Sequence, residues 1–85
     1  MKYNYFSDGG HGWLKVKKTE LNKLGISNEI SGYSYMKNGF AYLEEDGDAT
    51  LFIRTKKDKN EVVEIVPHES YKLSRIRNYQ TYKPL

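Results

Sequence analysis

Hydrophobic and polar side chains alternate in two segments near the N-terminus, and this pattern predicts two strands. Residues 2–7 are rich in aromatic side chains and mostly alternate, and residues 13–17 alternate again. Between them, residues 8–12 hold three of the seven glycines, so we expect a tight turn or an exposed loop there. The N-terminal part of the chain therefore reads as two strands joined by a glycine-rich connection.

A short helix is predicted after the second strand. Leu21 and Leu24 lie three residues apart, as on one face of a helix, and Gly25 follows them. Glycine is the usual residue just beyond a helix C-terminus, where the backbone turns left-handed. The helix is expected over residues 18–24.

The clearest local signal is a hairpin around Asn38 and Gly39. This dipeptide strongly favours a type I′ turn, and residues 31–36 and 40–44 flank it with apolar and aromatic side chains. Cross-strand aromatic pairs help to fix the register of such a hairpin. We expect Tyr33, Tyr35 and Met36 on one strand to face Phe40, Tyr42 and Leu43 on the other.

The segment 49–59 is ambiguous, and we interpret it as a second helix. Leu51, Phe52 and Thr55 suit one helical face, although Thr50, Ile53 and Thr55 are β-branched and would tolerate a strand. Asp48 stands where it would cap the helix, and acidic residues precede the run while lysines end it, which complements a helix dipole.

The predicted elements define an α+β fold in a single domain, residues 1–85. Residues 61–67 form a further strand that Pro67 is expected to terminate. The order is β-β-α-β-β-α-β with a tail, residues 68–85, that lacks a clear period. We expect a mostly antiparallel sheet of about five strands, with two helices packed on one face.

Composition excludes several classes of protein. Eighty-five residues leave room for one domain, and 38% hydrophobic with 29% charged residues suits a small soluble globular protein. The absence of cysteine removes disulfides, thiolate zinc sites and cysteine nucleophiles. No apolar run approaches the roughly 18 residues of a membrane span, and the N-terminus has no signal-peptide core. We expect a cytoplasmic protein without a membrane association.

Charge is distributed unevenly along the chain. The net charge is +3, but the turn at residues 44–48 carries four acids and no base: Glu44, Glu45, Asp46 and Asp48.

The tail carries four bases and one acid, together with Tyr71, Tyr79 and Tyr82. As a helix, the tail would place Tyr71, Arg75, Tyr79 and Tyr82 on one face; as a strand, it would align Tyr71, Leu73, Arg75, Arg77 and Tyr79. Either geometry sets guanidinium groups beside aromatic rings, which suits phosphorylated ligands or single strands, although solvated surface cations are the more ordinary interpretation.

Three features are candidates for a binding or catalytic site, and each also has a simpler structural interpretation. The glycines around His11 could cradle an anion, but no P-loop pattern follows and a hairpin loop explains them. The acidic turn could attract a divalent metal, but it lacks EF-hand spacing and could instead be a solvated turn or a patch for a basic partner. His11 and His68 could perform acid–base phosphodiester chemistry with Arg75 or Arg77 if they met in space. We expect no enzyme, no cofactor and no metal site.

Several blocks together resemble a family of small proteins from phages, prophages and plasmid-like genomes. The blocks are FSD at residues 6–8, GHGWLKV at 10–16, YSY at 33–35, AYLEED at 41–46 and SRIRNY at 74–79. The chain departs from the family pattern at Gly9, where the family has Pro, and at Gly47, where it often has Cys. The resemblance implies an accessory protein of a mobile element, and by analogy an inhibitor of host defence. It implies no catalytic residue.

Three hypotheses follow for the function. The first is a non-enzymatic protein that binds and blocks a host protein effector, such as a CRISPR nuclease, or sequesters a nucleotide signal. The acidic turn would then imitate nucleic-acid phosphate. The second is direct binding of a nucleotide or nucleic acid by the tail, and the third is a small phosphodiesterase or ribonuclease. The expected binding residues are His11, Trp13, Tyr71, Arg75, Arg77, Tyr79 and Tyr82. A homodimer is plausible because so small a domain gains much from additional buried area.

Overall fold

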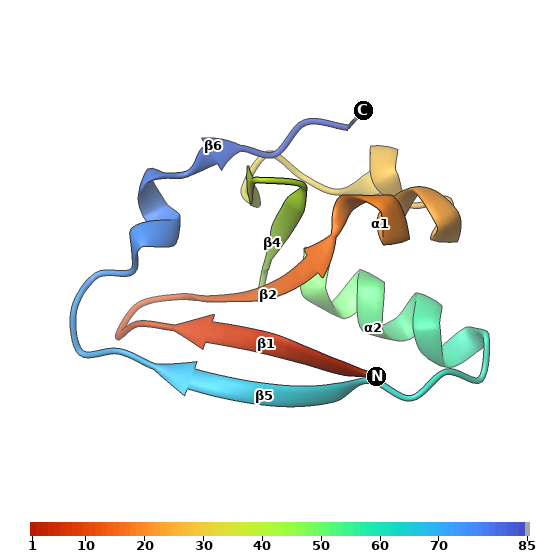
Figure 1. The fold of residues 1–85 in the computed structure, drawn as a ribbon, viewed down its shortest axis with the longest axis horizontal. Coiled ribbons are helices and arrows are strands. Elements are labelled where there is room, and N and C mark those ends of the chain that lie inside the picture. Colours follow the sequence, from red (N-terminus) through yellow and green to blue (C-terminus); the bar gives the residue numbers. More distant parts are fainter. Residues whose placement is uncertain (85) are drawn as a thin grey trace.

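A six-stranded sheet with the order β5-β1-β2-β4-β3-β6 forms the middle of the molecule in the computed structural model, which describes residues 1–84 (Figure 1). The strands are β1 (Lys2–Ser7), β2 (Gly12–Lys17), β3 (Tyr35–Lys37), β4 (Phe40–Glu44), β5 (Glu64–Glu69) and β6 (Gln80–Thr81). The helices are α1 (Lys18–Leu24) and α2 (Asp48–Asp58), with the 3₁₀ turns η1 (Ser27–Glu29) and η2 (Arg75–Asn78). The predicted α+β class and mostly antiparallel sheet are confirmed; only the β1–β5 pair is parallel.

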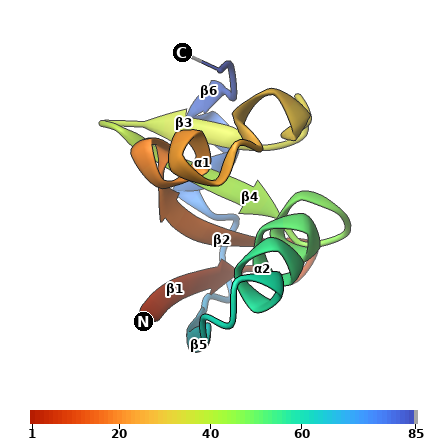
Figure 2. The ribbon, with the colours of Figure 1, turned by 90° about the vertical axis from the view of Figure 1, so that its right-hand side faces the viewer.

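The two faces of the sheet are covered differently. Both helices pack on one face, whereas η2 lies on the other (Figures 1 and 2). The helix-side core gathers the inward side chains of the strands, including Leu14, Val16 and Leu43, with Leu21 of α1 and Phe52 of α2. The alternation along each strand sends the neighbouring side chains to the opposite side, which we call the open face.

Local signals located the first helix and the turn of the hairpin. Helix α1 spans the predicted residues and ends at Gly25, whose φ of 74° is left-handed. Asn38 and Gly39 have φ values of 54° and 84°, which are the two positive angles that a type I′ turn requires. The segment 48–58 is helical, so the β-branched residues in it are outweighed by the face that buries Phe52 and Lys56.

The hairpin strand before the turn is shorter than predicted. Strand β3 begins at Tyr35, which pairs with Tyr42, and Met36 pairs with Ala41. Tyr33 lies outside the strand and is 81% exposed, so its expected place opposite the partner strand is wrong. The reason is the buried Ser34, whose hydroxyl donates to Asp48 and accepts from the backbone N–H of Glu44. These two bonds hold the chain in a turn before β3 begins.

The expected cap at Asp48 is wrong. Asp48 is the first residue of α2 and is buried, and its Oδ2 accepts from the backbone N–H of Ser31 and from the hydroxyls of Ser31 and Ser34. The Glu44 carboxylate instead receives the backbone N–H groups of Gly47 and Asp48. The hydrogen bonds from Ser31 and Ser34, which are distant in sequence, therefore outweigh the local preference of Asp48 for the N-cap position.

Pro67 does not end its strand, contrary to expectation. It lies within β5 and pairs with Tyr5 of β1. Strand β5 is at the edge of the sheet and pairs only with β1, so a residue without an N–H group is tolerated there.

The tail forms neither the continuous helix nor the long strand that the sequence allows. It forms the short turn η2, which the Ser74 hydroxyl caps by accepting from the N–H of Ile76, and then the two-residue strand β6. The expected common face of tyrosines therefore does not form. Tyr71 is fully exposed, whereas Tyr82 is buried in the helix-side core and hydrogen-bonds Ser27.

Candidate functional site

Aromatic side chains cluster on the open face of the sheet. Trp13 and Tyr42 are buried there beneath Ile76 of η2, and the half-buried rings of Phe6, Tyr35, Phe40 and Tyr79 pack around them. Because η2 is only four residues long, it covers part of this surface. Two hollows border it, and they differ in charge.

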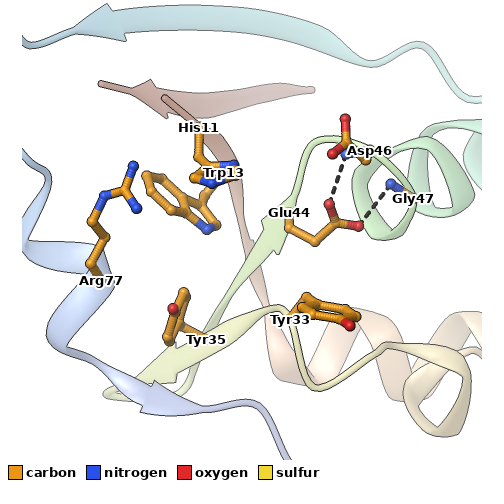
Figure 3. Close-up of a pocket in the computed structure, with 8 residues that line it drawn as sticks. All are labelled: His11, Trp13, Tyr33, Tyr35, Glu44, Asp46, Gly47 and Arg77. Atoms are coloured by element: carbon orange, nitrogen blue, oxygen red, sulfur yellow. Dashed lines mark hydrogen bonds between the residues drawn. The ribbon is translucent and has the colours of Figure 1, made fainter. Parts of the chain in front are cut away.

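The first hollow, which we call the aromatic–acidic pocket, has a volume of about 500 Å³. Three segments far apart in sequence build it: the end of the β1–β2 turn with β2, the β3–β4–α2 region, and η2. Figure 3 shows Arg77 beside Trp13 on one side of the pocket, with Glu44 and Asp46 on the other. Its lining residues are His11, Trp13, Tyr33, Tyr35, Glu44, Asp46, Gly47 and Arg77.

Asp8 holds one wall of this pocket in place. Its carboxylate accepts from Arg77 at both Nε and Nη2, at 2.8 Å each, and from the backbone N–H of Ser74 at 2.9 Å. The same carboxylate accepts from the N–H groups of Gly10 and His11 at 3.0 Å. The Arg77 guanidinium, followed by these backbone donors, holds the pKa of Asp8 well below its usual range. Asp8 therefore stays ionised and ties the β1–β2 turn to η2.

Trp13 forms the floor of the pocket. It is only 3% exposed, and the Arg77 guanidinium lies 5.4 Å from the centre of its ring. The rings of His11 and Tyr35 lie 6.1 and 6.3 Å away, centre to centre. Cation–π and edge contacts of this kind fix the orientation of the indole.

The four acids of the turn have separate places in the structure. Asp48 is buried beneath the surface, and Glu45 accepts from the Tyr5 hydroxyl at 2.8 Å, next to a different groove. Glu44 and Asp46 line the aromatic–acidic pocket. Within residues 1–84, no group of three potential ligands is placed to hold a metal ion.

The second hollow, the basic pocket, has a volume of about 480 Å³. Lys15, Lys72 and Arg75 line it, with no carboxylate from the described residues 1–84, and Phe6, Tyr42 and Tyr79 supply aromatic surface. Tyr42 and Tyr79 pack edge to face with centres 5.0 Å apart. The remaining lining residues are Ser70, Leu73, Ser74 and Ile76.

The structure brings together part of the predicted site. His11, Trp13 and Arg77 share the aromatic–acidic pocket with two of the acids, while Arg75 and Tyr79 line the basic pocket. Tyr71 lines neither of the two, and the buried Tyr82 and Asp48 are not surface contacts.

The two histidines do not form a pair. His68 stacks on Phe6 with centres 5.0 Å apart and its Nε2 lies 3.1 Å from Asn4 Oδ1, whereas His11 packs beside Trp13. Among residues 1–84, the two imidazoles make no hydrogen bond or ring contact with each other.

Sequence reasoning missed Asp8 and Tyr33 as site residues. An Asp before two glycines is a signal for a turn held by the carboxylate, and Asp8 does bind the N–H groups of its own loop. Its contact with Arg77, 69 residues away, has no local signal. The hairpin pattern predicts Tyr33 in a strand, but β3 begins only at Tyr35, and the Tyr33 ring therefore lines the pocket.

Comparisons with protein-family models, curated proteins and solved structures found no match for this chain. None of the helices described in residues 1–84 has the length and apolar character needed to cross a membrane. Arguments about function therefore rest on the open face and its two pockets.

Proposed function

We propose that this protein is a non-enzymatic binding protein that inhibits a component of bacterial host defence, such as a CRISPR effector nuclease. The observation that carries the proposal is the aromatic–acidic pocket. There, His11, Trp13 and Arg77 meet Glu44 and Asp46, which come from distant segments. The resemblance to proteins of phages and plasmids makes a defence effector the first class of partner to test.

The pocket is suited to recognition because its side chains are held before any partner arrives. Asp8 fixes Arg77 through two hydrogen bonds, and three backbone N–H groups fix the Glu44 carboxylate. Groups that are already ordered lose little conformational entropy on binding, so more of the contact energy contributes to affinity. Tyr33 adds a ring that is largely open to a partner.

The test is phage plating on bacteria that carry a defined CRISPR system, with and without the chain. Wild-type protein should restore plaques, and a variant with Tyr33→Ala and Asp46→Lys should lose this effect, because both side chains line the pocket and are exposed. A matched control is Arg54→Ala with Asp58→Ala, two exposed residues of α2 outside the pocket.

Purified effectors should bind the wild type and the control but not the pocket variant. If the folded protein protects phage against none of the defence systems tested, or if the pocket variant acts like the wild type, the proposal is wrong.

A second candidate function is the binding of a phosphate-bearing ligand in the basic pocket. In the part of the chain that the structure describes, three cations and no carboxylate line that pocket beside aromatic rings, which favours nucleotides or single strands. Titrations with nucleotides, cyclic dinucleotides and oligonucleotides would measure it, and affinity should fall steeply with salt. The double variant Lys72→Ala with Arg75→Ala should abolish binding. If the affinity does not fall with salt, or if this variant still binds, the second candidate function is wrong.

A further inference from the structure

We infer that the aromatic–acidic pocket accepts the guanidinium group of an arginine side chain on the partner protein. The inference rests on the proposed function only in that the arginine belongs to a protein partner. It is carried by the combination of aromatic walls with two carboxylates around one hollow. Charge, geometry and size each support it.

The charge of the pocket favours a cation. Among residues 1–84, Arg77 is the only Lys or Arg in the lining, and Asp8 already neutralises it through Nε and Nη2. Glu44 and Asp46 have no salt bridge to any Lys, Arg or His among residues 1–84. Their two negative charges are left to attract a positive group from outside the chain.

The Glu44 carboxylate is fixed in position with acceptor capacity to spare. Its Oε1 accepts from the N–H groups of Gly47 at 2.7 Å and Asp48 at 3.0 Å, and its Oε2 accepts from Asp46 at 2.8 Å. An ionised carboxylate oxygen has two lone pairs, so Oε2 can accept one further hydrogen bond. A guanidinium presents several donors in a planar fork, which suits such an acceptor.

The aromatic walls suit a planar cation. The Trp13 ring is only 3% exposed and already packs against the Arg77 guanidinium, so the more accessible rings of Tyr33 and Tyr35 are the ones that an incoming cation would contact. Tyr33 and Tyr35 face the same hollow, and Figure 3 shows the Tyr33 ring near the Glu44 side of the pocket. The volume of about 500 Å³ exceeds what one guanidinium needs, so the hollow also has room for part of the loop that carries the arginine.

A nucleotide suits this pocket less well. Its base could stack on the same rings, but its phosphates would meet Glu44 and Asp46 in a confined space. A nucleotide therefore fits the basic pocket better, and it serves here as a competing probe.

The experiment is an NMR titration of the full chain with small probes. N-acetylarginine amide should shift the Trp13 indole N–H and the backbone N–H of Gly47, with saturation at millimolar concentrations. The corresponding citrulline compound has nearly the same shape but no charge and should shift neither signal. Asp46→Asn should weaken arginine binding about fivefold. Asp58→Asn on α2 is the matched control and should leave the affinity unchanged.

Three results would overturn the inference: equal shifts with citrulline, no shifts with arginine, or the same shifts with adenosine monophosphate. Phage plating separates this inference from the proposed function. Protection that survives in the Asp46→Asn variant, without arginine binding by the wild type, overturns the inference alone. Arginine binding without protection against any defence system leaves the inference standing and overturns the proposed function.

Discussion

A buried ion pair joins the two helices to the N-terminal strand, and we expect its removal to destabilise the fold strongly. Lys56 of α2 is only 2% exposed, and its Nζ lies 2.6 Å from Oε2 of Glu20 in α1 and 3.3 Å from Oε1 of Glu61. Glu20 also accepts from the Tyr3 hydroxyl at 2.8 Å. Burial lowers the pKa of Lys56, but hydrogen bonds to Glu20, Tyr3 and Glu61 outweigh it and raise the pKa above its usual value. Lys56 is therefore charged inside the protein.

The size of the effect follows from what remains around Lys56. Removing one partner of a buried pair generally costs about 3–5 kcal/mol, because the other charge is left uncompensated. The Glu61 carboxylate would still lie 3.3 Å from Nζ after Glu20→Gln, so we expect a smaller loss of about 2–3 kcal/mol. In a domain of this size that corresponds to a fall in Tm of about 10–20 °C.

Urea and thermal unfolding, followed by the fluorescence of the single buried tryptophan, measure this loss. Glu61→Gln is the matched control, because Glu61 is 45% exposed and its contact with Lys56 should contribute no more than about 1 kcal/mol. The double variant Glu20→Gln with Lys56→Met should regain much of the stability, since it leaves no buried charge unpaired. Equal losses for Glu20→Gln and Glu61→Gln, or a double variant less stable than Glu20→Gln alone, would refute the reasoning.

Three further predictions each concern one contact elsewhere in the structure: Tyr5 with Glu45, Ser34 with Asp48, and Asp8 with Arg77. Burial and a hydrogen bond to the Glu45 carboxylate raise the pKa of Tyr5 from 10.0 to about 12. The contribution of the Tyr5 hydroxyl to stability is therefore complete below pH 10 and is lost as the pH rises through about 12. In urea unfolding, Tyr5→Phe should remove this part of the loss of stability at alkaline pH. Ser34→Ala should lower the free energy of unfolding by about 1–3 kcal/mol, because the buried Asp48 carboxylate loses a donor, and thermal unfolding checks it. Asp8→Asn should weaken the hold on Arg77 and speed amide hydrogen exchange in η2 while exchange in α2 stays unchanged.

Much of the fold could be predicted because its signals are local. Asn38 with Gly39, and Leu21 and Leu24 with Gly25, act over a few residues, and the structure has the turn and the helix where they were expected. The errors came where distant groups compete. Asp48 is a good helix cap by its local sequence, but the hydroxyls of a turn 14 to 17 residues earlier take its carboxylate.

The candidate site was predictable in its parts but not in its assembly. Trp13, Arg77 and the acids are unusual enough in composition and charge to be chosen from the sequence. Their meeting at one hollow depends on the Asp8–Arg77 pair and on the place of η2, neither of which a periodic pattern encodes. The basic pocket could not be foreseen either, because Lys15 projects from a strand toward a tail whose path has no period.

The two pockets have a common origin in the unequal covering of the sheet. Both helices lie on one face, so the aromatic rings of the other face are covered mainly by η2, which is too short to cover them all. Arg77 lines the aromatic–acidic pocket and Arg75 lines the basic pocket, although only one residue separates them, because Asp8 turns Arg77 toward the β1–β2 connection. A partner that lies across η2 therefore contacts negative charge at the aromatic–acidic pocket and positive charge at the basic pocket. Complementary contact requires a cation near Glu44 and Asp46 and an anion near Lys72 and Arg75, which restricts both the partner and the orientation in which it can dock.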